Sequence, residues 1–108
     1  MSPVGIALVA LDGAWLDVND SLCRMLGYTR FELLARKFQD ITHPDDLDAD
    51  LALVQQVIDG SNASYKLEKR YIHGDGHVVW ASLYVSLVRD DAGEPLYFVS
   101  QIVDMTEH

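Results

Sequence analysis

Cysteine, basic residues and long apolar runs are all scarce in this chain. Its one cysteine, Cys23, cannot close an internal disulfide, which fits a reducing compartment. No apolar run is long enough to span a bilayer, and the N-terminus lacks the basic region and hydrophobic block of a signal peptide. These absences predict a cytoplasmic protein whose domain makes no contact with a membrane.

Positive charge is the scarcer sign. The chain has 8 lysine and arginine residues against 17 aspartate and glutamate residues, a formal net charge of −9. Such acidity repels a phosphate backbone, so we expect no nucleic-acid partner. With 49% hydrophobic and 23% charged residues, and no repeat, the composition predicts one globular domain over residues 1–108.

The clearest pattern is the alternation over residues 77–89, which predicts a long strand opened by an Asp-Gly turn. One face is aliphatic and would close a core, whereas the other carries two large aromatic residues. We therefore expect a partner on the second face. The two faces are Ala81, Leu83, Val85 and Leu87 on one side, and Trp80, Ser82, Tyr84 and Ser86 on the other.

The first part of the chain predicts a hairpin over residues 5–18 that turns at an Asp-Gly pair. Asn19 then caps a short helix that stops at Gly27. Thr29 and Glu32 have the spacing of a capping box for a second short helix.

A longer helix is predicted over residues 45–59, with Thr42 as its cap and Pro44 in its first turn. We expect Leu51→Asp to abolish cooperative folding, because the new charge would lie on the buried face of this helix. The apolar stripe that defines this face is Leu47, Leu51, Val54 and Ile58.

Three alternating segments follow, at residues 64–72, 77–89 and 95–103. Together with the hairpin and helices they predict an α+β fold: a five-stranded antiparallel sheet with short helices and one longer helix packed on one face.

The order and spacing of several strings resemble the PAS domain, in particular the bacterial PAS/S-box sensory family. Gly74 departs from the pattern, since the family more often has a basic residue there, and this leaves Glu32 without a usual ion-pair partner. The matching strings are Val18-Asn19, Leu26-Gly27-Tyr28, Glu32-Leu33, His43-Pro44-Asp45-Asp46, Glu68 with Arg70, Asp75-Gly76, Trp80, Arg89-Asp90 with Gly93, and Asp104-Met105-Thr106.

The resemblance implies a sensory or dimerisation module upstream of an effector such as a histidine kinase or diguanylate cyclase. The closing string Asp104-Met105-Thr106 would be the exit that joins the sheet to that effector. Because the chain stops two residues later, we expect a sensor cut from a longer signal-transduction protein.

The resemblance also implies a ligand pocket between the sheet and the helices. On residue type alone, its lining is more often simply a packed core, so a small-metabolite ligand stays an alternative. The candidates are Leu22, Met25, Phe38, Ile41, Leu51, Val54, Ile58, Leu67, Lys69, Tyr71, Ala81, Leu83, Phe98, Ser100 and Ile102.

Lys69 is the one charged candidate, because strand alternation turns it toward the core with Leu67 and Tyr71. We expect its long stem to carry the ammonium to the edge of the domain. The alternative is that Lys69 meets the carboxylate of a small acidic ligand.

No cofactor is expected. Light-sensing relatives bind flavin through a cysteine where this chain has Phe38, and they place two asparagines and a glutamine where it has Tyr71, Ala81 and Ile102. Cys23 lies one helix earlier and is typical of a small core residue. Haem would need an axial ligand on the longer helix, which contains no histidine.

Neither a metal nor a catalytic site is expected. His73, Asp75 and His77 are close in sequence, but structural metal sites usually recruit four ligands, and hairpin tips commonly carry such polar residues. The adjacent Asp45-Asp46 pair is explained by the positive end of a helix, and the serines of the long strand have no evident histidine base. A stand-alone enzyme is therefore the weakest hypothesis.

A homodimer is the favoured assembly. Only four residues precede the first strand, too few for a helix that would cover the outer face of the sheet, so a second copy is expected there. The interface candidates are Trp80, Tyr84, Tyr97, Val99 and Val103.

Overall fold

The computed structural model describes residues 4–105. In chain order its elements are β1 (Gly5–Val9), β2 (Trp15–Val18), α1 (Asp20–Leu26), α2 (Arg30–Leu34), the 3-10 helix η1 (Phe38–Ile41), α3 (Pro44–Ile58), β3 (Ser64–Ile72), β4 (Val78–Arg89) and β5 (Pro95–Asp104). The predicted strands and helices are thus all present. The short helix η1 is additional, in a segment too mixed to assign by periodicity.

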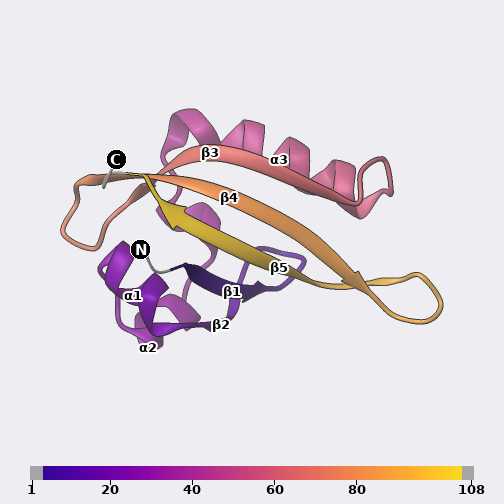
Figure 1. The fold of residues 1–108 in the computed structure, drawn as a ribbon, viewed down its shortest axis with the longest axis horizontal. Coiled ribbons are helices and arrows are strands. Elements are labelled where there is room, and N and C mark those ends of the chain that lie inside the picture. Colours follow the sequence, from indigo (N-terminus) through magenta and orange to yellow (C-terminus); the bar gives the residue numbers. More distant parts are fainter. Residues whose placement is uncertain (1–3, 106–108) are drawn as a thin grey trace.

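The five strands form one antiparallel sheet in the order β2-β1-β5-β4-β3. The first hairpin therefore joins the C-terminal meander through β5, and β2 and β3 are the two edges. The helix α3 lies along β3 and β4, whereas α1 and α2 lie by β1 and β2, as Figure 1 shows. The predicted fold class is confirmed.

Local capping explains where the short helices begin and end. The side chain of Asn19 accepts a hydrogen bond from the backbone of Leu22, and α1 ends at Gly27 with a φ of 75°, a left-handed conformation that favours glycine. Thr29 and Glu32 form the predicted capping box of α2. The carboxylate of Glu32 thus accepts a hydrogen bond from the backbone of Thr29 at 2.9 Å.

The start of α3 differs from the prediction by one residue. His43 is the N-cap, since its Nδ1 accepts from the backbone of Asp45 at 3.1 Å, and Pro44 is the first helical residue. Thr42 does not cap the helix. Its hydroxyl turns inward, donates to the carbonyl of Phe38 at 2.8 Å and is buried.

The buried face of α3 is rotated from the predicted stripe. Asp50 and Val57 are its fully buried residues, and Leu51 is 37% exposed. Residues 47, 50, 54 and 57 follow the three-and-four spacing of a single helix face just as well as the all-apolar stripe does. The expectation that Leu51 is buried was wrong, because only apolar residues were counted when the face was chosen.

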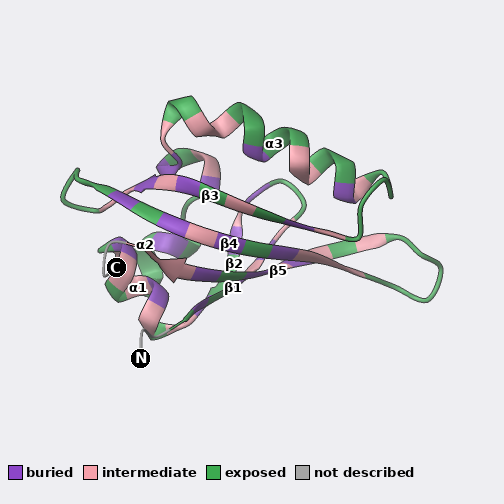
Figure 2. Ribbon diagram, turned by 45° about the horizontal axis from the view of Figure 1, so that its top comes forward, coloured by how far each residue is buried: buried purple, intermediate pink, exposed green. Residues whose placement is uncertain are grey.

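The core lies between the helices and the inner face of the sheet, where purple segments face one another in Figure 2. It confirms the alternation of β4, since Ala81, Leu83 and Val85 are buried whereas Trp80 and Tyr84 are exposed. Among the described residues, no helix is long and apolar enough to cross a membrane.

Candidate functional site

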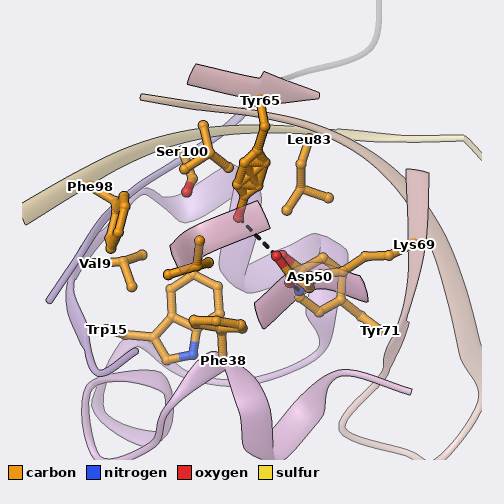
Figure 3. Close-up of a pocket in the computed structure, with 12 residues that line it drawn as sticks. Val9, Trp15, Phe38, Asp50, Tyr65, Lys69, Tyr71, Leu83, Phe98 and Ser100 are labelled. Atoms are coloured by element: carbon orange, nitrogen blue, oxygen red, sulfur yellow. Dashed lines mark hydrogen bonds and ion pairs between the residues drawn. The ribbon is translucent and has the colours of Figure 1, made fainter. Parts of the chain in front are cut away.

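A small cavity of about 20 Å³ lies in the middle of this core. A space of this size holds about one water molecule. Its wall combines helix, sheet and η1 residues, drawn in Figure 3. The lining residues are Val9, Trp15, Phe38, Asp50, Val54, Tyr65, Lys69, Tyr71, Leu83, Val85, Phe98 and Ser100.

A buried ion pair forms the polar side of the cavity. Nζ of Lys69 on β3 lies 2.5 Å from Oδ2 of Asp50 on α3, and each side chain is 1% exposed. Lys69 also donates to the hydroxyl of Thr42 at 2.9 Å, and the hydroxyl of Tyr65 donates to Oδ1 of Asp50 at 2.8 Å. The expectation that Lys69 snorkels was wrong, because the chain supplies a carboxylate partner inside the core.

Two aromatic rings complete the surroundings of the ammonium. The centroids of Phe38 and Tyr71 lie 4.7 and 4.5 Å from Nζ of Lys69, within cation-π range. Burial lowers the pKa of Lys69, and the charge of Asp50 opposes that shift. Burial, followed by the negative charge of Asp50, raises the pKa of Tyr65 and of Tyr71. Both phenols therefore keep their protons over a wide pH range.

One buried donor at the cavity wall has no partner among the described residues. Trp15 is 3% exposed, and its indole Nε1 makes no hydrogen bond. A buried N–H of this kind costs about 1 to 3 kcal/mol when it is left without an acceptor. The cavity wall thus carries one ion pair whose partners are satisfied and one N–H donor, that of Trp15, without an acceptor within residues 4–105.

The predicted pocket residues divide into two groups. Those that line the cavity are Phe38, Val54, Lys69, Tyr71, Leu83, Phe98 and Ser100. The others lie elsewhere: Leu22, Ile41, Ala81 and Ile102 are buried in the surrounding core, Met25 and Ile58 pack against it, Leu67 is half-buried, and Leu51 faces outward.

Sequence reasoning missed five lining residues, of which Asp50 matters most. A lysine on the inward face of β3 was itself the signal, because a buried ammonium requires an anion. The long helix offers such a carboxylate at Asp50, three residues after Leu47 and four before Val54. The other lining residues that were missed are Val9, Trp15, Tyr65 and Val85.

The outer face of the sheet is a second candidate site. Trp80 and Tyr84 are 44% and 42% exposed. The register places Ser82 opposite Val103 and Ser86 opposite Val99. Both valines are thus diagonal neighbours of the exposed aromatics, as the antiparallel pattern predicts.

Tyr97 does not join this cluster. It is opposite Val88, beyond Ser86 along β4, next to an irregularity in the pairing at Val88 and Arg89. Alternation correctly predicted the face of Tyr97 but not its position along the sheet.

The exit of the chain lies at the same end of the sheet as Trp80. Asp104 is opposite Ala81, and the backbone N–H of Met105 donates to the carbonyl of Trp80 at 2.9 Å. Thr106, the last residue of the predicted exit string, is outside the described residues. The exit is thus bonded directly to the strand that carries the exposed aromatics.

Comparisons with known proteins agree with this architecture. A family model described as the PAS fold matches residues 16–102. The structure of a PAS domain from Colwellia psychrerythraea has a TM-score of 0.87 at 18% identity, covering 97% of this chain and 88% of that one.

Two curated relatives extend the comparison to whole signalling proteins. The chain is 49% identical over 106 residues to the probable diguanylate cyclase DgcE of Escherichia coli (strain K12), covering 98% of this chain and 10% of the relative. It is 27% identical over 106 residues to the sensor histidine kinase TmoS of Ectopseudomonas mendocina, covering 98% of this chain and 11% of the relative. The chain thus spans about a tenth of the length of these relatives.

The family match covers most of the chain, and the antiparallel sheet with its helices on one face is the fold of the solved PAS domains. This chain belongs to the PAS family.

Proposed function

We propose that this chain is a non-catalytic, cytoplasmic sensory and dimerisation module that passes a change in its quaternary arrangement to a C-terminal effector. The observation that carries the proposal is the bond between Met105 and Trp80, which connects the chain's exit to the exposed aromatic face. The relatives named as a diguanylate cyclase and a sensor histidine kinase support an effector of one of these types. The 49% identity favours the cyclase type.

The outer face has the character of an interface. Two half-exposed aromatic residues lie on one strand, with Val99 and Val103 of the neighbouring strand beside them. Aromatic side chains bury about 150 to 250 Å² each, so pairing of two copies would remove a large apolar area from water. A second copy of this chain, related by a two-fold axis, is the partner that we propose for this surface.

A small-ligand receptor is the second candidate, favoured by the unpartnered Nε1 of Trp15 at the cavity wall. Against it stand the size of the cavity, which holds about one water, and the pairing of Lys69 with Asp50, which leaves no free cation among the described residues that line the cavity. A metabolite would have to displace side chains such as Phe38. Water is the occupant that fits without such movement.

Cofactor-free operation is part of the proposal. Ala81 and Ile102, which stand where flavin-binding relatives carry polar residues, are fully buried among apolar neighbours. Cys23 lies on α1, away from the residues that line the cavity, and no histidine occurs on α3. These residues support the proposal that the domain works without an adduct-forming flavin and without a haem bound through α3.

Three measurements on protein purified from cells test the proposal. Sedimentation equilibrium should give a dimer at micromolar concentration, and native mass spectrometry should give a chain mass without a retained organic ligand. An absorption spectrum should be colourless above the aromatic band. A monomer at high micromolar concentration would overturn the dimerisation module, whereas a stoichiometric ligand mass or a flavin or haem band would favour the receptor.

A further inference from the structure

The hairpin between β3 and β4 gathers three metal-binding side chains. His73, Asp75 and His77 each offer one ligand atom, and these atoms all lie within 4.8 Å of one another. Nδ1 of His73 is 3.1 Å and Nδ1 of His77 is 2.5 Å from the same oxygen, Oδ1 of Asp75. The hairpin is the orange loop beside the C-terminal end of the described chain in Figure 1.

The backbone holds this arrangement in place. The N–H of His73 donates to the carbonyl of His77 at 2.8 Å, and the N–H of Gly76 donates to the carbonyl of His73 at 2.8 Å. Gly76 has a φ of 99°, which this tight turn requires. The N–H of His77 donates to Oδ1 of Asp75 at 3.0 Å, so the carboxylate is held in the turn beside the two rings.

The fold also supports the hairpin from one side. The N–H of Gly74 donates to the carbonyl of Leu26 at 2.9 Å, at the end of α1. A Cβ atom on Gly27 would stand 2.0 Å from Cε1 of His73, so the glycine makes room for the imidazole. The ring of His73 is consequently held against α1, only 20% exposed, whereas His77 is open to solvent.

A simple polar turn does not account for all of this geometry. The bond from the His77 backbone to Asp75 is common at turns and explains the position of the carboxylate. The backbone N–H of Asp75 likewise donates to Nδ1 of His73 at 3.1 Å and explains the position of that ring. Neither backbone bond requires the ring of His77 to stack on His73 with centroids 4.3 Å apart, or its Nδ1 to lie 2.5 Å from Oδ1 of Asp75. Two imidazoles and a carboxylate are ligands suited to zinc, copper and nickel.

We propose that His73, Asp75 and His77 form a binding site for a divalent transition-metal ion such as Zn²⁺ or Ni²⁺. Three protein ligands leave at least one position for water, so the site is an open one. The ion would replace the hydrogen bond between the ring of His77 and Oδ1 of Asp75, and the one that Nδ1 of His73 accepts from the backbone N–H of Asp75. The ligand atoms would have to move closer together than 4.8 Å, because metal-to-ligand distances are about 2 Å.

The position of the site gives the ion a route to the proposed signalling function. β4 begins at Val78, directly after His77, and two residues later Trp80 accepts the hydrogen bond from Met105. An ion at the hairpin would fix the start of the strand to which the chain's exit is bonded. Metal binding itself does not depend on the proposed function and can be tested alone.

Calorimetric titration of chelator-treated protein with ZnCl₂ and NiCl₂ tests the site. We expect saturable binding of one ion per chain, weakened by at least about tenfold in His77→Ala, since even outer-shell partners account for tenfold or more. Asp75→Asn keeps an oxygen for the His77 backbone and removes the charge, and it should also weaken binding. His43→Ala and His108→Ala remove the remaining two of the four histidines and should bind as the parent does.

A second readout keeps the test independent of folding in the variants. In the parent protein, Zn²⁺ should shift the backbone NMR resonances of residues 73–77 and those of neighbouring Gly27. Resonance shifts confined to other regions, unchanged affinity in a folded His77→Ala, or loss of binding in His43→Ala or His108→Ala would each overturn the assignment. So would the absence of saturable binding.

Discussion

Lys69 and Arg70, consecutive residues of β3, both bind the same helix. Lys69 pairs with Asp50 inside the core, while Arg70 donates to Asp46, one turn earlier on α3, through Nε at 3.0 Å and a terminal nitrogen at 2.8 Å. The guanidinium of Arg70 also lies 5.0 Å from the ring of Trp80. The edge strand is therefore joined to α3 by two ion pairs, and the second pair also contacts the outer aromatic face.

Breaking the buried pair should be strongly destabilising. Asp50→Leu or Lys69→Met leaves one buried partner uncompensated, and we expect a loss of about 3 to 5 kcal/mol in the free energy of unfolding. The double variant Asp50→Leu with Lys69→Met should recover most of this loss, because no buried charge remains. Urea unfolding of all three variants measures the coupling. Losses that simply add in the double variant would contradict the pairing.

The rotated face of α3 can be tested by placing a new charge at two positions. Leu51→Asp should lower the unfolding free energy by less than about 1 kcal/mol, because position 51 reaches solvent. Val57→Asp should prevent cooperative folding, because Val57 is buried and a carboxylate there costs several kcal/mol. Thermal melts followed by circular dichroism distinguish the two variants. Equal melting temperatures for the two variants would support the buried face predicted from sequence, with Leu51 on it.

Acid should weaken the contact between Asp46 and Arg70. Hydrogen bonds from Arg70 lower the pKa of Asp46 to about 2. A carboxylate whose pKa is lowered by folding stabilises the folded state fully when the pH is above its ordinary pKa near 4. This stabilisation is lost as the pH falls toward 2. We expect this pair to contribute about 1 to 2 kcal/mol, reduced from the full shift by partial solvation.

Unfolding titrations between pH 7 and pH 2 check this pH dependence. In Asp46→Asn, the part of the acid-induced loss of stability that comes from the Asp46–Arg70 pair should be absent. Arg70→Gln should have the same effect, because it removes the partner of Asp46. If Asp46→Asn loses stability with the same slope as the parent, the pair is not responsible for the loss.

Charge on the outer face should separate the proposed dimer. Trp80→Glu and Tyr84→Glu should each shift sedimentation toward monomer at micromolar concentration, because like charges would face each other across the interface. Their circular dichroism should match that of the parent. Phe31→Glu is the matched control, since Phe31 is an aromatic residue that is 83% exposed on α2, away from this face. A shift in the control alone would place the interface at α2.

Local signals were enough to predict the order of elements. Asn19, Gly27 and Thr29 act on the backbone next to them, and the alternation of β4 has a period that only a strand satisfies, so tertiary context did not override them. The same reasoning correctly turned Lys69 inward. These features depend on neighbours in sequence.

The features that were missed depend on neighbours in space. The partner of Lys69 is Asp50, on a helix whose orientation is set by packing, and a polar residue was not considered for its buried face. The position of Tyr97 depends on strand register, which alternation leaves free. The size of the cavity depends on how all its lining side chains pack together, and the hydrophobic periodicity of the sequence does not predict that packing.

Gly74 of the β3–β4 hairpin packs directly against Gly27 at the end of α1. A Cβ atom on Gly74 would stand 2.1 Å from the carbonyl oxygen of Gly27, so even alanine at position 74 would push the β3–β4 hairpin off α1. The N–H of Gly74 donates to the carbonyl of Leu26, and this hydrogen bond protects the amide from exchange only while both the hairpin and α1 are folded. In native-state hydrogen exchange, this amide should therefore exchange together with those of α1, as one cooperative unit built from distant parts of the chain.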